Sequence, residues 1–204
     1  MKTILIANPK GGSGKTTISI NTAGYLANRG DCVALLDLDR QQSASLWIES
    51  RPENLPYIAT LETRKNDNLL DDWLVVDTPA GLRGKDLTDT LRSADKIIVP
   101  VCPSLFDLHA SRDFLQALAE EKKNRKGKYD IGIVGMRMAA NTRASQALEH
   151  FLSTLDLPIL GYLRETQIYV NAAFEGKSLF DLPNYIAERE IAQWSYLQDW
   201  IVKH

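Results

Sequence analysis

Hydrophobic residues gather along this chain in short continuous runs, separated by longer stretches with helix-like spacing of apolar positions. Runs such as Leu74–Val76 and Ile97–Val99 contain no polar residue, which is typical of strands covered on both faces of a parallel sheet. The pattern predicts strands at Lys2–Ala7, Cys32–Asp37, Pro56–Thr60, Trp73–Asp77, Lys96–Val101, Tyr129–Met136 and Pro158–Gly161. It predicts helices at Lys15–Asn28, Gln42–Glu49, Leu87–Ser93, Ser111–Lys123, Arg143–Leu155, Val170–Glu175 and Asn184–Val202. We therefore expect an α/β fold, a mostly parallel sheet with helices on both faces and ligands at the carboxyl ends of its strands.

A glycine-rich segment directly follows the first predicted strand. Residues 9–16 read Pro-Lys-Gly-Gly-Ser-Gly-Lys-Thr. Glycines let the backbone approach a phosphate group closely and point its N–H groups at it. In such a phosphate loop we expect Lys15 to reach the β- and γ-phosphates of a nucleotide, and the hydroxyl of Thr16 to ligate Mg²⁺. The usual motif has glycine where this chain has Pro9, and a second lysine, Lys10, precedes the glycine pair.

Carboxylates follow two other predicted strands. Asp37 and Asp39 come at the end of the second strand, and positions i and i+2 of an extended segment share one face. Next to a nucleotide, one carboxylate can support Mg²⁺ while the other orients a water molecule. Asp77 ends an apolar strand, an arrangement that delivers a carboxylate to the magnesium shell. The same residues also suit strand-end turns in which aspartates cap a following helix.

Three segments together resemble one family. Residues 10–17 (KGGSGKTT) resemble the deviant Walker A motif of the ParA/MinD ATPases, which are P-loop NTPases. Residues 37–45 resemble that family's switch I signature D-x-D-P-Q-x-x-x-[ST], except that Arg40 stands in the proline position. Residues 73–81 (WLVVDTPAG) resemble its Walker B strand and switch II. The resemblance covers essentially the whole chain and implies a single ATPase domain over residues 1–204, without an N-terminal helix-turn-helix extension.

The resemblance implies a role for each motif residue. The family holds ATP between two subunits, so the chain is expected to form a homodimer with ATP and Mg²⁺ at the interface. Lys10 would reach the phosphates in the partner subunit, although an exposed loop lysine without a role is the alternative. Lys10, Lys15 and Asp39 would be the catalytic residues, with Asp39 positioning water. The nucleotide would be bound by Lys10, Gly11, Gly12, Ser13, Gly14, Lys15, Thr16 and Thr17, and the metal by Thr16, Asp37 and Asp77.

Two later segments are less decisive. Residues 102–107 (CPSLFD) resemble the start of an interface helix in small, plasmid-type members, but Asp107 equally suits an ordinary helix N-cap. Gly135-Met136-Arg137 falls where the family often contacts adenine, commonly through asparagine. Because asparagine is missing here, we assign no contact to the base.

Composition narrows the function further. The chain has 204 residues, 44% of them hydrophobic and 25% charged, which fits one ordinary globular domain with a sizeable core. Cys32 and Cys102 lie in or beside apolar runs and are interpreted as reduced residues of a cytoplasmic protein. No apolar run is long enough for a transmembrane helix, and the N-terminal strand leaves no room for a signal peptide. The net charge of −2 means that any nucleic-acid binding needs a local patch.

The resemblance implies a nucleoid-associated protein whose ATP-bound dimer binds DNA without sequence preference. A cargo-linked activator would raise a slow basal turnover and release the dimer. The cargo would be a plasmid or a large body such as a carboxysome or chemoreceptor cluster. Candidate DNA contacts are Lys122, Lys123, Arg125, Lys126, Lys128, Arg143 and Lys177, with Arg164 as a further basic residue. Lysines at the end of a helix also favour its dipole, so the cluster has a purely structural alternative.

Two other classes of protein share this kind of phosphate loop. A MinD-like membrane-cycling ATPase would need a terminal amphipathic helix, and apolar residues do recur there at positions 191, 194, 197 and 201. Such a stripe also suits docking on the core, and the acidic residues nearby oppose an anionic membrane, so no integral membrane contact is expected. Metabolic and redox relatives are disfavoured because Cys32 and Cys102 do not match a cluster site and nothing marks a carboxylate substrate pocket.

Overall fold

The computed structural model describes residues 1–60, 63, 72–124 and 129–203. Within these ranges six parallel strands form one sheet in the order β2-β3-β1-β4-β5-β6. The strands are β1 (Lys2–Ile6), β2 (Val33–Asp37), β3 (Trp73–Asp77), β4 (Lys96–Val101), β5 (Asp130–Met138) and β6 (Ile159–Arg164). The expected α/β fold with a parallel sheet is confirmed.

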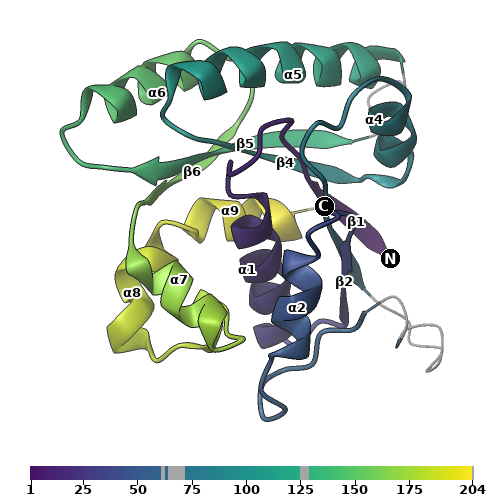
Figure 1. Ribbon diagram of the computed structural model, residues 1–204, viewed down its shortest axis with the longest axis vertical. Helices are drawn as coiled ribbons and strands as arrows, with labels where there is room; N and C mark the ends of the chain where they lie inside the picture. The colour runs from purple at the N-terminus through teal and green to yellow at the C-terminus, as the bar shows by residue number, and fades with distance from the viewer. Residues whose placement is uncertain (61–62, 64–71, 125–128, 204) are drawn as a thin grey trace.

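Helices cover both faces of this sheet. Figure 1 shows α5 and α6 along one face, and α1, α2, α7, α8 and α9 on the other. Their bounds are α1 (Lys15–Asn28), α2 (Ser43–Glu49), α4 (Gly84–Thr90), α5 (Leu105–Asn124), α6 (Arg143–Ser153), α7 (Gln167–Phe174), α8 (Asn184–Ala192) and α9 (Ser195–Val202). Short 3₁₀ helices η1 (Leu91–Ser93) and η2 (Leu179–Asp181) complete the described elements. No helix in the described ranges has both the length and the apolar character to cross a membrane.

The continuous apolar runs divide between two hydrophobic cores. In β1, Ile4 and Ile6 contribute to the core beneath α1, whereas Leu5 and the following Ala7 contribute to the core beneath α5 and α6. Successive side chains of a strand point to opposite faces, so a strand buried on both sides needs apolar residues at every position. This is why the sequence shows runs here instead of alternation.

One predicted strand is wrong. Residues 56–60 form no strand, and only Ala59 makes a parallel bridge, to Ala34 of β2. Ala59 exchanges both of its backbone hydrogen bonds with β2, but Pro56 has no N–H to donate, and Tyr57 is exposed. The segment therefore touches the sheet edge at a single residue instead of extending it.

The last predicted helix is divided in two, between α8 and α9. Trp194 at the break is completely buried, and its indole N–H donates to the hydroxyl of Tyr169 at 2.9 Å. Leu197 and Ile201 are buried in the same core. The terminal apolar stripe thus docks on the protein itself, the alternative that the sequence had left open.

Helix α5 begins at Leu105, six residues before its predicted start. The hydroxyl of Ser104 accepts a hydrogen bond from the backbone N–H of Asp107 at 3.1 Å and pairs with the Asp107 carboxylate. Asp107 therefore lies in the first turn, where a carboxylate favours the helix dipole, instead of at the N-cap. The remaining elements agree with the predicted ones to within a few residues at each end.

Candidate nucleotide-binding site

A buried asparagine, Asn8, joins the start of the glycine-rich loop to β4 and α5. The side-chain oxygen of Asn8 accepts the backbone N–H of Lys10 at 2.9 Å. Its amide group donates to the carbonyl of Pro100 on β4 at 2.7 Å and to the hydroxyl of Ser111 on α5 at 3.2 Å. One side chain thus ties the entrance of the loop to the neighbouring strand and helix. Asn8 was not predicted, because its partners lie on elements distant in sequence.

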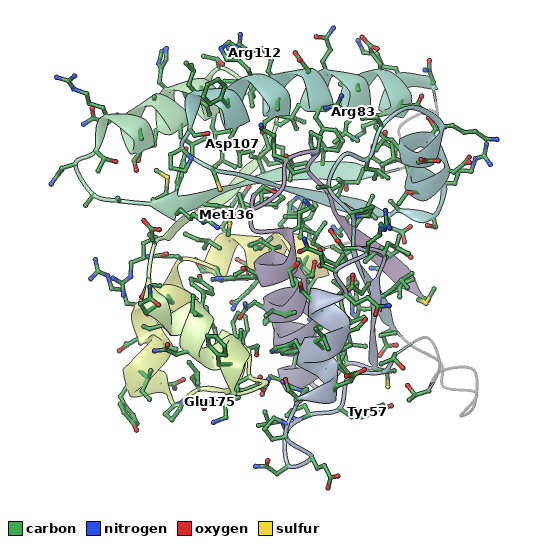
Figure 2. The ribbon with its side chains drawn as sticks, in the orientation of Figure 1. Tyr57, Arg83, Asp107, Arg112, Met136 and Glu175 are labelled. Carbon is green, nitrogen blue, oxygen red and sulfur yellow. The ribbon has the colours of Figure 1, made fainter. Side chains whose placement is uncertain are left out.

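Two glycines of the loop adopt left-handed backbone conformations that other residues rarely take. Gly12 has φ of +73° and Gly14, which precedes α1, has φ of +94°. A Cβ atom on Gly14 would lie 2.7 Å from the terminal carbon of Met136. Figure 2 labels Met136 beside the end of α1 that meets the sheet. The loop therefore keeps its shape through glycine and through close contact with the end of β5.

Lys15 is the first residue of α1, and it is buried. Its ammonium donates to the carbonyl of Lys10 at 2.9 Å, across the mouth of the loop. Burial lowers the pKa of Lys15, while the nearby carboxylates of Asp77 and Asp39 act in the opposite direction. The cation is thus held at the loop with its charge close to two carboxylates.

Asp77 ends β3 and is buried beneath α1. Its carboxylate accepts the hydroxyl of Thr16 at 2.7 Å and the hydroxyl of Ser19 at 3.1 Å. Burial raises the pKa of Asp77 to about 6, although both hydroxyl bonds act to lower it. Ser19 was not predicted. Its place one turn after Thr16 puts both on one helix face, but only the packing of α1 beside β3 shows that this face meets Asp77.

The oxygens of Thr16 and Asp77 fit a magnesium ion. Hydroxyl and carboxylate oxygens are its preferred protein ligands, and Mg²⁺ is usually held by one or two carboxylates together with the phosphates of its substrate. The 2.7 Å contact shows that both groups already meet at one point. A bound Mg²⁺ would neutralise phosphate charge there.

The two aspartates of the switch I segment have different surroundings. One oxygen of Asp37 accepts the backbone N–H groups of Ala44 and Ser45 at the start of α2, at 2.9 and 3.0 Å. Its other oxygen accepts the N–H of Asp39 at 2.9 Å. Asp37 therefore caps a helix, the alternative that the sequence had left open, and its role toward Mg²⁺ stays a prediction. One carboxylate oxygen of Asp39 accepts the backbone N–H of Gln41 at 3.0 Å.

These parts meet around one cavity of about 440 Å³. It is lined by Gly11, Gly12, Gly14, Lys15, Thr16, Thr17, Asp39, Arg40, Gln41, Pro79, Ala80 and Arg137. The cavity thus joins the phosphate loop, the switch I residue Asp39 and the backbone after β3, which are distant in sequence. Lys10 and Asp37 do not line it, and Arg137 was not predicted to.

One family model matches most of the chain. Residues 4–180 match the family model of the CobQ/CobB/MinD/ParA nucleotide binding domain. The chain belongs to this family. Its motifs are therefore those of a ParA/MinD-type ATPase, as the sequence indicated.

Two relatives with known names are similar in sequence to most of this chain. The ParA-family chain is 30% identical over 190 residues to "Maintenance of carboxysome distribution protein A" of Halothiobacillus neapolitanus, with 88% of this chain and 87% of that protein covered. It is 47% identical over 186 residues to the chromosome-partitioning ATPase Soj of Thermus thermophilus, with 73% of this chain and 74% of that protein covered. The chain is thus homologous to positioning and partitioning ATPases.

Solved structures show the same fold. An Asp-to-Ala variant of Cyanothece McdA in complex with ATP has a TM-score of 0.76 at 17% identity, covering 100% of this chain and 98% of that one. The MinC:MinD cell division complex of Aquifex aeolicus contains a chain with a TM-score of 0.75 at 17% identity, covering 100% and 97%. At these identities the likeness establishes the fold alone.

The described basic residues among those predicted to bind DNA have different surroundings, and their role toward DNA stays a prediction. Lys122 lies 3.5 Å from Asp130, and Lys177 pairs with Glu175 at 2.7 Å. Arg164 pairs with the buried Glu190. Lys123 and Arg143 are exposed, but α5 ends at the far side of its layer from α6, as Figure 1 shows. Arg125, Lys126 and Lys128 lie outside the described residues.

A second cavity, of about 580 Å³, opens beside the phosphate loop. It shares Thr16 and Thr17 with the first one but is otherwise lined by α1, α2 and α7, through residues such as Leu46, Trp47 and Phe174. These side chains are largely apolar. The first cavity, with its glycines and its lysine, is therefore the site suited to phosphate.

Alanine at Gly14 should weaken nucleotide binding, whereas alanine at Gly30 should not. Gly30 follows α1 with φ of +93°, almost the same as Gly14, but nothing lies within 4 Å of its added Cβ. Both substitutions should lower the free energy of unfolding by about 1–2 kcal/mol through backbone strain. Only Gly14→Ala should also weaken ATP binding, roughly 10-fold, which corresponds to about 1.4 kcal/mol. Denaturation and equilibrium ATP binding measure both quantities; equal ATP affinities would contradict the role of Gly14.

In the nucleotide-free protein, the buried carboxylate of Asp77 lowers folding stability as pH rises. Replacing Asp77 with asparagine should remove this loss. The folded carboxyl keeps its proton to about pH 6, whereas the unfolded one loses it near its ordinary value of 3.8. Wild-type stability therefore falls as pH rises between these values, by about 3 kcal/mol at 1.4 kcal/mol per pKa unit. Relative to wild type, Asp77→Asn should gain up to that amount between pH 4 and pH 7.

Urea denaturation at both pH values measures this gain. Asp156→Asn, which replaces an exposed carboxylate, controls for the loss of one charge. A constant difference between Asp77→Asn and wild type across this pH range would show that Asp77 ionises normally.

Proposed function

We propose that this protein is a dimerising ATPase that binds DNA without sequence preference and positions a large cargo. The ATP-bound dimer would hold DNA, and a cargo-linked activator would stimulate hydrolysis and release. The observation that carries the proposal is the single cavity that gathers Lys15, Thr16 and Asp39 around the phosphate loop. The relatives named for carboxysome distribution and chromosome partitioning support a positioning role.

For ATP hydrolysis the protein mainly has to position the reacting groups and neutralise the negative charge of the phosphates. In phosphoryl transfer to water, catalysis comes mostly from alignment and from neutralising charge on the transferred group. Lys15 would neutralise the β- and γ-phosphates, and Thr16 and Asp77 would hold Mg²⁺. Asp39 faces the same cavity with one carboxylate oxygen not engaged by Gln41, so it can orient the attacking water.

Lys10 would complete the site of a second subunit. Its backbone is held on both sides, by Asn8 through the N–H and by Lys15 through the carbonyl. Among the described residues its ammonium forms no ion pair, and it does not line its own subunit's cavity. An unpaired cation on a fixed backbone at the edge of the loop suits a contact across an ATP-sandwich interface.

A membrane-cycling role has less support. The terminal stripe that would enter a bilayer is instead packed in the core, with Trp194, Leu197 and Ile201 each at most 1% exposed. We therefore keep DNA as the surface that the dimer binds.

Binding to random duplex DNA tests the proposal. It is measured with ATP and Mg²⁺, with ADP, and without nucleotide, each at low and then moderate salt. We expect binding only with ATP, weakening as salt rises, because contacts to phosphates release counterions. Absence of DNA binding in every state, despite ATP-driven dimerisation, would refute it.

The basic cluster is tested separately. Lys122, Lys123, Arg125, Lys126 and Lys128 are replaced together by alanine, and DNA affinity is compared with that of the wild type. A loss of affinity with a shallower salt dependence would assign the cluster to DNA. Unchanged affinity would leave it as a solvated helix end.

A further inference from the structure

Arg137 has an unusual backbone for its place in the fold. It lies within β5, yet its φ is +51°, in the left-handed region that residues other than glycine rarely adopt. The other described non-glycine residues with positive φ are Gln42 and Asn141, and both lie at or beside turns that precede a helix. Of these three described residues, Arg137 is the one that lies inside a strand.

The strand is irregular at the same point. The pairing of β5 with β6 shifts register between Gly135 and Met138. Irregularities of this kind redirect a side chain and are common beside active sites. Met136, directly before Arg137, is buried against Gly14 of the phosphate loop, while Arg137 itself is exposed. The shift therefore places consecutive residues on the loop and at the opening of the cavity.

Arg137 faces the cavity opposite a second arginine. It lines the 440 Å³ cavity together with Lys15 and Arg40. Because β2 and β5 lie on opposite sides of β1 in the sheet, Arg40 and Arg137 reach the phosphate loop from opposite sides. Three cations, two of them from outside the loop, thus border a space suited to an anionic ligand.

Arg137 forms no salt bridge with a described acidic residue, although Asp39 lines the same cavity. Its guanidinium makes no hydrogen bond with any residue in the described ranges, in contrast to Arg51 and Arg164, which pair with carboxylates. Strained backbone at a cavity persists where the surrounding structure enforces it, and such outliers cluster at sites that bind ligands. The strained backbone fixes Arg137 at the cavity, and its exposed guanidinium has no ion-pair partner among the described residues. Such a group is suited to bind a negatively charged ligand.

We propose that Arg137 binds the phosphate chain of the nucleotide, on the side of the loop opposite Arg40. This inference rests on the proposed function, because it deepens the ATP site described there. The guanidinium would donate charge-assisted hydrogen bonds to phosphate oxygens. Arg137 would hold the triphosphate, so its loss should weaken ATP affinity more directly than it lowers the rate of hydrolysis.

Arg137→Gly and Arg137→Lys test the proposal by equilibrium ATP binding at low and high salt. Glycine accepts the left-handed backbone without strain, so Arg137→Gly should unfold at no lower temperature than the wild type. It should bind ATP about 10-fold or more weakly at low salt, as expected for losing a hydrogen bond to a charged group. The difference should shrink at high salt. Arg137→Lys should recover part of the affinity because it keeps the charge.

A control variant and the outcomes below distinguish failure of this inference from failure of the proposed function. Arg189→Gly removes an exposed arginine of α8, outside the cavity, and should leave ATP affinity unchanged. If Arg137→Gly binds ATP within twofold of the wild type, the inference is wrong while the ATP site stands. The same conclusion holds if ATP affinity persists and only DNA binding is lost, which would assign Arg137 to DNA. If the wild type binds no ATP, the proposed function itself fails.

Discussion

Lys15→Ala should abolish ATP binding, with an affinity at least about 100-fold below that of the wild type. The ammonium is buried at the mouth of the loop and is fixed by the carbonyl of Lys10 at 2.9 Å. Each hydrogen bond to a charged group contributes about 1.5–3 kcal/mol, and the lysine is expected to contact two phosphates. Equilibrium binding of ATP measures the loss.

A second lysine in the same loop provides the matched control. Lys10→Ala should retain ATP binding in the monomer, because the side chain of Lys10 does not line its own cavity. It should instead fail to form the ATP-dependent dimer, measured by size-exclusion chromatography with light scattering. Equal ATP affinities of Lys15→Ala and the wild type would remove Lys15 from the site.

Asp39→Ala should bind ATP normally but lose almost all hydrolysis, and it should accumulate as an ATP-bound dimer. Asp39 lines the cavity, but its backbone partner Gln41 is exposed, so little structure depends on its carboxylate. Its loss removes the group that orients water, and positioning is the main component of this chemistry. Phosphate release, ATP affinity and oligomeric state are measured together. Full turnover in this variant would exclude Asp39 from the mechanism.

Asp37→Ala is the matched control for a neighbouring carboxylate. Asp37 accepts three backbone N–H groups, so its removal should lower the free energy of unfolding by about 1–2 kcal/mol, as for loss of a helix cap. Asp39→Ala should leave stability close to the wild-type value. The two variants thus separate a structural carboxylate from a mechanistic one. If both variants are destabilised equally, this separation fails.

Local sequence was a good guide wherever a residue's role depends on its immediate neighbours. The strands around β1 were readable because both faces of a parallel sheet need apolar side chains at every position. Gly14 and Lys15 were readable because a loop that surrounds a phosphate needs glycine followed by a cation at the start of a helix. Asp77 was readable because an apolar strand delivers it to the same edge.

Sequence was a poor guide where a choice depended on distant contacts. Asp37 suited both a metal site and a helix cap, and only the position of α2 shows that its oxygens meet backbone N–H groups. The terminal helix was predicted as continuous, because the sequence does not show that Trp194 at the break is buried and bonded to Tyr169. Residues 56–60 had strand-like composition but met the sheet at one residue.

By itself, therefore, the sequence determined the α/β class, the phosphate loop and the family, because these depend on periodicity and on short motifs whose residues act together locally. Tertiary structure alone decided that Ser19 joins Thr16 on Asp77, that Asn8 anchors the loop, and that Arg137 lines the cavity beside the glycine-rich loop. Each of these depends on how strands distant in sequence lie side by side. No local pattern encodes that arrangement, because it is set by the packing of the whole sheet between its two layers of helices.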